Sequence, residues 1–231
     1  MSFFEDIAAA LDAEGVESRV NGDVLFVPIT SDIEIQFVEI DAALPAANVY
    51  IAAADVDEDD EYFEAALVSV AFSVEDAVAT VAEHIATDQV VTVLRDLLEG
   101  RDERIANLEF EHHHHDPAVV LADVAENSHL RVSVELSDGV PTASLSFLAY
   151  TPDANTELIS PLGEPVDQDD QAADSDFFGV GDLEYGGEPE ILVLGTFTDF
   201  DRLFEILSLC VEQADDWELQ LKPCDDGIEA Q

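Results

Sequence analysis

Apolar residues in this chain follow two spacings, one typical of helices and one typical of strands. Near the start, Phe4, Ile7 and Leu11 are three and four residues apart, which places them on one face of a helix, and Gly15 follows as a stop signal. In residues 33–37 every second position is apolar, which is the period of a half-buried strand. The pattern therefore predicts an opening helix followed by a β-rich segment.

The rest of the first half continues the β-rich pattern and then changes to a helical one. Asn21 and Gly22 form a dipeptide that is typical of tight hairpin turns. A helix is predicted over residues 73–86, and residues 88–99 form either a second helix or its continuation, closed by Gly100. Strands are predicted over residues 16–20, 24–29, 33–40, 48–56 and 63–72.

The second half is predicted to contain strands, helices and one long insertion. Asp116 and Pro117 resemble an N-cap and a first helical residue, so a helix is predicted over 116–129. The Ser-Asp-Gly at 137–139 predicts the turn of a two-strand hairpin. Residues 152–188 are poor in strand formers and rich in Asp, Gly and Pro, so a flexible insertion is predicted there. The remaining predictions are strands over 105–112, 188–197 and 217–222 and a helix over 198–214.

The two halves have a similar order of predicted elements. Residues 67–85 and 192–210 each predict a strand followed by an amphipathic helix, and we infer a weak internal repeat from them. We expect an α+β protein with two similar halves, each an antiparallel sheet with helices on one face. The expected boundaries are 1–103 and 104–231, and the second half holds the acidic insertion at 152–188. The alignment pairs Phe72 with Phe197, Ser73 with Thr198 as N-caps, and Asp76 with Asp201.

The composition predicts an ordinary apolar core and a strongly negative surface. Of 231 residues, 48% are hydrophobic, which is enough to build a folded core. The chain also has 54 Asp and Glu against 7 Lys and Arg, a formal net charge of -47. A field this negative repels the backbone of nucleic acids and anionic lipid heads. Neither nucleic acid nor a membrane is therefore expected as a partner.

Three explanations of the acidity stay open at this point. It can reflect salt adaptation and solubility, an acidic face that meets a basic protein partner, or mimicry of nucleic acid. The sequence opens with acids rather than with a basic and then apolar leader, and no apolar run has the length of a membrane helix. Cys210 and Cys224 form no disulfide framework, and Cys210 is expected in the core. These features favour a cytoplasmic location.

Four histidines in a row, His112–His115, form the most unusual short motif. Because side chains alternate along a strand, Glu111, His113 and His115 are expected on one face, away from the core, and His112 on the core side. Imidazole and carboxylate groups in this arrangement could bind a divalent transition metal such as zinc, nickel or copper. The alternatives are a solvated connector and a response to pH, since histidine titrates near neutral pH. No other cofactor is expected.

Motifs of known enzymes are missing from the sequence. Asp55, Asp57 and Asp59 have the spacing of a calcium loop, but Asp60 stands where an EF-hand needs Gly and Ala66 where it needs Glu. There is no phosphate-binding loop, nucleophile elbow or metalloprotease motif. An enzyme with an unrecognised site stays open, but a non-catalytic protein is favoured, so no catalytic residue is predicted.

The order of helix and strands over residues 3–29, together with the strand–helix ends of both halves, resembles that of the YbjN-like proteins and the related secretion chaperones. This resemblance implies a small, acidic α/β module that binds protein segments and has no catalytic site. We therefore expect a non-catalytic protein-binding or chaperone-like module, with a metal- or pH-responsive protein using His112–His115 as the alternative. A protein partner, which could be basic, is expected, and a homodimer is a further option.

Overall fold

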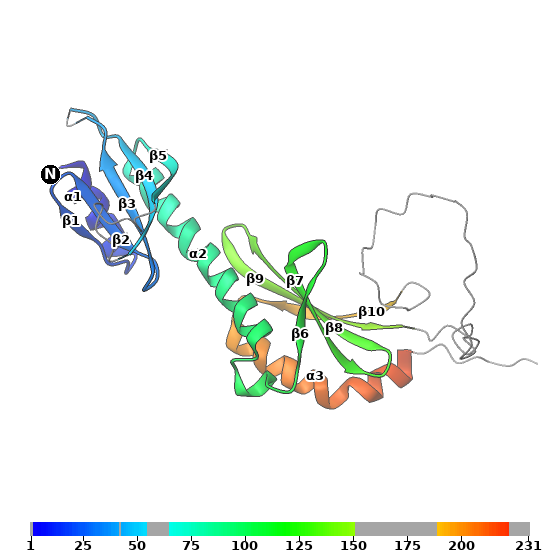
Figure 1. The fold of residues 1–231 in the computed structure, drawn as a ribbon. Coiled ribbons are helices and arrows are strands. Elements are labelled where there is room, and N and C mark those ends of the chain that lie inside the picture. Colours follow the sequence, from blue (N-terminus) through cyan, green and yellow to red (C-terminus); the bar gives the residue numbers. More distant parts are fainter. Residues whose placement is uncertain (1, 42, 55–64, 151–188, 222–231) are drawn as a thin grey trace, which may run out of the picture. The chain divides into compact units, whose positions relative to one another are not determined.

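The chain folds into two compact units, each with its own antiparallel sheet (Figure 1). The computed structural model describes residues 2–41, 43–54, 65–150 and 189–221. Unit 1 is Met1–Gln89 and unit 2 is Val90–Gln231, so the division falls inside a helix, before the boundary predicted between residues 103 and 104. The α+β class with two similar sheet halves is confirmed. The insertion predicted at 152–188 lies outside the described residues.

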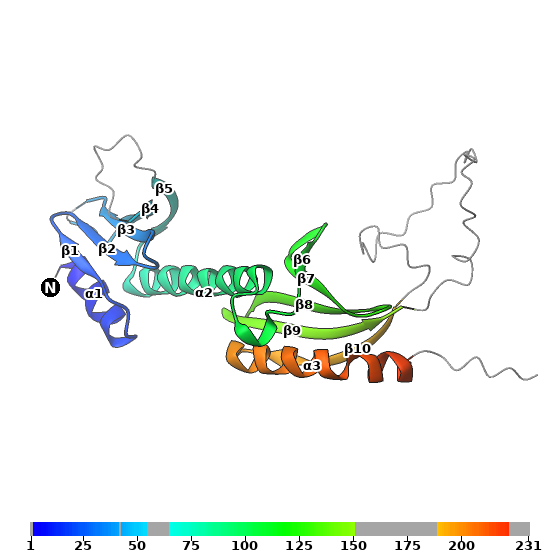
Figure 2. The ribbon, with the colours of Figure 1, turned by 60° about the horizontal axis from the view of Figure 1, so that its bottom comes forward.

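Unit 1 is a five-stranded meander with helices on one face (Figure 2). Its first helix has a capping box in which Ser2 Oγ accepts from the Glu5 N–H at 3.3 Å and Glu5 Oε2 accepts from the Ser2 N–H at 2.8 Å. The sheet order follows the chain, and all pairings are antiparallel. The elements are α1 (Phe3–Ala13), β1 (Arg19–Asn21), β2 (Val24–Pro28), β3 (Ile33–Glu39), β4 (Ala47–Ala53), β5 (Ala65–Ala71) and α2 (Val74–Glu99).

Unit 2 repeats this order after the last turns of α2. A short 3-10 helix, η1 (Glu103–Ile105), leads into the second sheet, whose order is β10-β9-β8-β7-β6. The final helix, α3 (Phe200–Leu221), lies along one face of that sheet (Figure 2). The strands are β6 (Phe110–His113), β7 (Asp116–Ala125), β8 (Ser128–Ser137), β9 (Val140–Ala149) and β10 (Glu190–Phe197).

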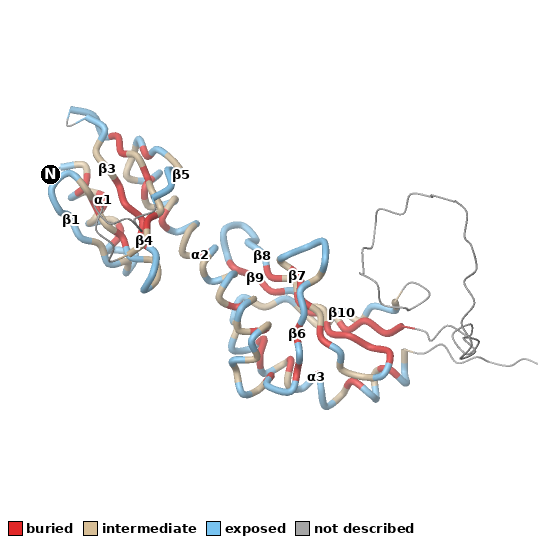
Figure 3. The backbone as a smooth tube through the Cα atoms, viewed as in Figure 1, coloured by how far each residue is buried: buried red, intermediate tan, exposed pale blue. Residues whose placement is uncertain are grey.

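Helix α2 contributes to both cores. It is one continuous helix of 26 residues, so of the two alternatives left open for residues 88–99 the continuation is the one observed, and Gly100 follows it with φ 57°. Ala77 and Val81 of its first half are buried in the core of unit 1. Val93 and Leu97 of its second half are buried in the core of unit 2. Figure 3 shows buried stretches along the strands of both sheets, and in β3 the four consecutive residues 34–37 are all buried.

Two of the predicted elements in the second half are wrong, and of the strand predicted over 105–112 only residues 110–112 are in a strand, β6. Residues 116–129 form β7 and the start of β8 instead of a helix. Asp116 Oδ1 accepts from the Ala118 N–H at 2.9 Å, so the Asp-Pro signal marks a turn into a strand. Residues 217–222, predicted as a strand, hold the last turns of α3 as far as Leu221. Apolar residues alternate there, as in a strand. However, the buried face of α3 continues through Cys210 and Ala214, and this helical pattern extends the helix to Leu221.

The last strand of each sheet has a β-bulge and is followed by a helix. Val68 is the extra residue in β5, between the pairs Leu67–Tyr50 and Ser69–Val49. Leu194 is the extra residue in β10. Ser73 caps α2, since its Oγ accepts from the Asp76 N–H at 3.0 Å. The cap of α3 is Asp199 and not Thr198, because Asp199 Oδ1 accepts from the Asp201 N–H at 3.1 Å and the Arg202 N–H at 3.3 Å. These landmarks are shifted by one residue from the predicted alignment, and the sequence repeat itself stays a prediction.

A buried carboxylate joins α3 to the turn between β7 and β8. Glu218 is only 5% exposed. Its Oε2 accepts from the Asn127 N–H at 3.0 Å and from Ser128 Oγ at 2.7 Å, and its Oε1 accepts from Asn127 Nδ2 at 3.2 Å. A buried carboxylate requires such donors, because burial without them costs several kcal/mol, on the order of the 2–7 kcal/mol estimated for polar groups. The contact therefore fixes the C-terminal turns of α3 on the sheet.

An arginine fork joins η1 to the start of α3. Arg104 donates from Nε and Nη2 to the two oxygens of Asp102, at 2.8 and 2.6 Å, and from Nη2 to Asp201 Oδ1 at 2.9 Å. Its guanidinium also lies 5.5 Å from the centre of the Phe204 ring. The hydrogen bond from the Arg104 side chain lowers the pKa of Asp102 from 3.8 to about 2.

This pKa shift predicts a loss of stability in acid. Because the folded-state pKa is below the unfolded one, the ion pair stabilises the fold fully above 3.8, and its contribution is lost as the pH falls through about 2. Thermal unfolding of the wild type and of Asp102→Asn should therefore differ at pH 6, and the difference should shrink towards about pH 2. A difference that is constant over this range would contradict the assignment.

Candidate functional site

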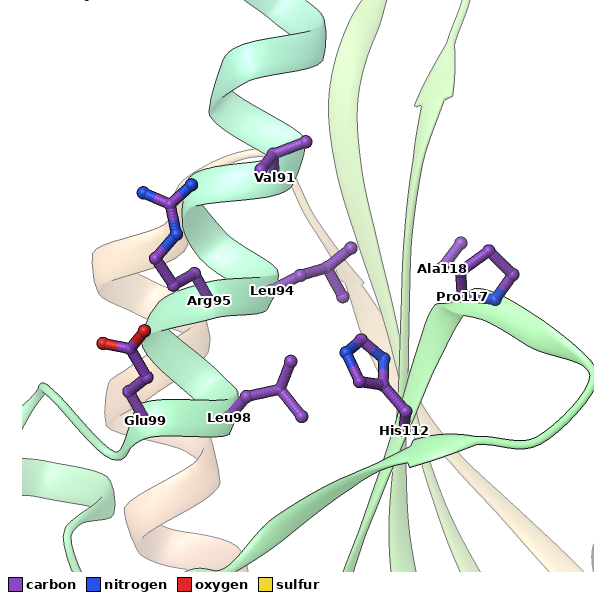
Figure 4. A pocket seen from close by; sticks show the side chains of 8 residues that line it. All are labelled: Val91, Leu94, Arg95, Leu98, Glu99, His112, Pro117 and Ala118. Atoms are coloured by element: carbon purple, nitrogen blue, oxygen red, sulfur yellow. The ribbon is translucent and has the colours of Figure 1, made fainter. Parts of the chain in front are cut away.

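An apolar groove lies on the surface of unit 2 (Figure 4). It has a volume of about 510 Å³. One wall is the second half of α2, and the other is the hairpin of β6 and β7. The lining residues are Val91, Leu94, Arg95, Leu98, Glu99, His112, Pro117 and Ala118.

The helical wall of the groove is aliphatic, with charges on its flank. Val91, Leu94 and Leu98 are three and four residues apart and therefore share one face of α2. Figure 4 shows these three side chains pointing towards the hairpin, whereas Arg95 and Glu99 lie along the outer side of the helix. Val91 is 44% exposed, although it belongs to the apolar stripe of the helix. Val91 thus remains open to a ligand, whereas Leu94 and Leu98 are partly buried against the core of unit 2.

The hairpin wall contributes one imidazole and two small apolar residues. His112 pairs with Val120, whose side chain is buried in the core of unit 2, so His112 lies on the core side of the sheet as predicted. In Figure 4 its ring points across the groove towards Leu94 and Leu98. Pro117 and Ala118 begin β7 on the other side of the hairpin turn. His112 is the only histidine of the run that lines the groove.

The other residues of the histidine run lie at the tip of this hairpin. The ring centres of His113 and His115 are 6.1 Å apart, in an edge-to-face arrangement, and the His115 N–H donates to His113 Nδ1 at 3.4 Å. Glu111 pairs with Leu121, which places it on the sheet face opposite the core. A β-bulge between His112 and His113 interrupts the simple alternation that the sequence suggested. His113 and His115 nevertheless lie beside each other at the hairpin tip.

The predicted metal ligands do not gain a further partner in the described structure. Across residues 2–41, 43–54, 65–150 and 189–221, no group of three or more His, Cys, Asp or Glu side chains is arranged to hold a metal ion. Protein zinc sites use three or four such ligands. The metal site at Glu111, His113 and His115 therefore stays a prediction of the sequence.

Cys210 has no part in the groove. It is 1% exposed and belongs to the core of unit 2, as predicted. Burial raises the pKa of its thiol to about 11, which leaves little thiolate at neutral pH. Cys224 lies outside the described residues.

The groove can bind an apolar group but offers little for catalysis. Its only polar side chains are Arg95, Glu99 and His112, and they do not converge, because the first two lie on the flank of the helix (Figure 4). A catalytic site needs several polar groups directed at one point. The sequence could not reveal this groove, because one of its walls is the β6–β7 hairpin and residues 116–129 were predicted to be a helix.

Comparisons of the chain with protein-family models, with curated proteins and with solved structures found no match. Among the helices that the structure describes, none has the length and apolar character needed to cross a membrane. The resemblance to the YbjN-like proteins therefore stays a prediction.

Proposed function

We propose that this chain is a non-catalytic protein-binding module that holds an apolar segment of a partner in the groove of unit 2. The observation that carries the proposal is the open aliphatic face of α2, with Val91, Leu94 and Leu98 directed at the β6–β7 hairpin. Exposed apolar surface with a polar rim is typical of interaction sites. The volume of about 510 Å³ is enough for a few side chains of a peptide.

The net charge supports a basic partner. With a formal charge of -47, the chain attracts cationic proteins and speeds their association. A segment with aliphatic anchors and flanking Lys or Arg would match both the groove and the surrounding field. The cytoplasmic location and the homodimer expected from the sequence stay predictions.

A peptide selection tests this proposal. The full chain is screened against a random peptide library, and the consensus peptide is synthesised with a fluorescent label. We expect a consensus with an aliphatic anchor and basic flanks, whose affinity falls as salt is added. We expect Val91→Glu to lower the affinity for this peptide about 30-fold, which is the effect of losing an interface hot spot.

Leu209→Glu on α3 is the matched control. Leu209 is 48% exposed, close to the 44% of Val91, and does not line the groove. This variant receives the same new charge and should bind the peptide as the wild type does. Equal affinity of the peptide for Val91→Glu and wild type, or a selection that yields no consensus, would refute the proposal.

A further inference from the structure

Strand β5 is an unprotected edge of the first sheet. It is the last strand in the order β1-β2-β3-β4-β5, and its seven residues, AALVSVA, include no charged side chain. Most of it is exposed, as Figure 3 shows. Natural edge strands are usually shielded by charges or proline, because a free edge pairs with other chains. The exposed large apolar residues are Leu67 (57%), Val68 (41%), Val70 (37%) and the following Phe72 (66%).

The free edge offers backbone hydrogen bonds as well as apolar contact. In an antiparallel strand, every second residue directs its N–H and C=O away from the paired neighbour, which here is β4. Leu67 pairs with Tyr50, Val70 pairs with Asn48, and both lie on the face opposite the helices. An added strand would cover these side chains and satisfy the outward backbone groups.

Carboxylates stand at the end of this edge. Asp76 Oδ2 accepts from the Phe72 N–H at 3.4 Å, so its carboxylate lies beside the last exposed residue of the edge. Glu75 precedes it in the first turn of α2. The sequence holds no Lys or Arg between Arg19 and Arg95. Among the described residues, neither Glu75 nor Asp76 forms an ion pair.

The corresponding edge of unit 2 has a different charge. Strand β10 is also an edge, and Val193, the residue before its bulge, is 73% exposed, as Leu67 is exposed before the bulge of β5. At the end of β10, however, Asp201 is paired with Arg104 at 2.9 Å, and Arg202 follows. At the end of β5, by contrast, no arginine is paired with Glu75 or Asp76 among the residues that the structure describes.

We propose that β5 receives an extended segment of a cationic partner protein, which adds a sixth strand to the first sheet. Alternate apolar side chains of the segment lie against Leu67 and Phe72, and a Lys or Arg at its end meets Glu75 and Asp76. A second copy of this chain is a poorer occupant, because it brings another formal charge of -47 to the same edge. This surface belongs to unit 1, so the proposal stands or falls independently of the groove.

The test uses a synthetic probe on the full chain. The probe is a capped, fluorescent peptide of alternating valine and threonine with lysine at both ends, and its affinity is measured by anisotropy. We expect Leu67→Lys to weaken binding about tenfold, because it places a cation on the edge and removes an apolar contact. We expect Glu75→Gln to weaken it less and to reduce its salt dependence.

Val193→Lys is the matched control, since it adds the same charge at the equivalent position of β10. It should leave the affinity unchanged. Each affinity is measured in a chain that carries Val91→Glu, because the groove is itself proposed to bind an apolar peptide with basic ends. A probe with N-methylated alternate amides should not bind, because it cannot form the added ladder.

Three results would overturn the proposal. The first is equal weakening by Leu67→Lys and Val193→Lys, which would mean attraction to the overall charge. The second is undiminished binding of the N-methylated probe. The third is a dimer in sedimentation that Leu67→Lys abolishes without any probe, which would assign the edge to a second copy.

Discussion

Replacing Glu218 with alanine is expected to destabilise unit 2 by about 3 kcal/mol. The substitution leaves the Asn127 N–H and the Ser128 hydroxyl without the acceptor that they have at 3.0 and 2.7 Å. Unpaired donors in a buried place cost about 1–3 kcal/mol each. Glu218→Gln should have an intermediate effect, since the amide keeps one acceptor oxygen and directs its NH₂ group at a donor.

Tryptophan fluorescence measures this effect in unit 2 alone. Trp217 is the only tryptophan of the chain, and its ring packs edge-to-face on Phe147, with ring centres 5.5 Å apart. Urea titrations of the wild type and of Glu218→Ala, followed by this signal, give the difference in free energy of unfolding. Glu212→Ala, an exposed change on the same helix, should stay within about 0.5 kcal/mol of wild type. Equal stabilities of Glu218→Ala and Glu212→Ala would contradict the role of the buried carboxylate.

Phe37→Ala is expected to destabilise unit 1 by about 4 kcal/mol and to affect unit 2 much less. Phe37 is fully buried in the core of unit 1, between Leu25 of β2 and Val49 of β4. Removing its ring leaves a cavity that the neighbouring strands fill only in part. The two units have separate cores, and α2 contributes a different half to each.

Hydrogen exchange separates the responses of the two units. Amides of β3 should exchange much faster in Phe37→Ala than in wild type, while amides of β9 should change little. Val20→Ala, a change at a residue that is 48% exposed on β1, is the control. The account of two cores would be wrong if the amides of both sheets were to lose protection equally.

The elements of unit 1 could be predicted well because each follows from a local pattern. The alternation in residues 33–37 and the Asn-Gly turn describe a meander of neighbouring strands, and such contacts are short in sequence. The helix over 73–99 was also visible, down to Gly100 at its end. What the sequence could not supply was the order of strands, and therefore the exposure of the edge at β5.

The errors in unit 2 arise where local signals favour two structures. AVVLADVA after Asp116 is apolar enough for either a helix or a buried strand, and its pairing with β8 decides between them. The burial of Glu218 could not be predicted, because composition does not distinguish one buried acid among the 54 Asp and Glu residues. The groove was hidden by the first of these errors alone, since it requires β7 as a strand beside the end of α2.

The alternation of side chains along a strand predicts the side of the sheet on which His112 lies, but not the bulge that follows it. It placed His112 with the core residues, and the register to Val120 confirms this. The bulge at His112 and His113 was beyond the pattern, because a bulge depends on the partner strand. The run of histidines thus contributes one residue to the groove and leaves the others at the hairpin tip.

We have proposed that this acidic chain binds an apolar segment of a partner protein between α2 and the β6–β7 hairpin. Hydrogen exchange on the full chain, with and without a saturating amount of the peptide selected from the library, tests it most directly. We expect slower exchange in residues 91–99 and 112–118 when the peptide is bound, and no such change in Val91→Glu. Protection confined to other residues, or none at saturation, would contradict it.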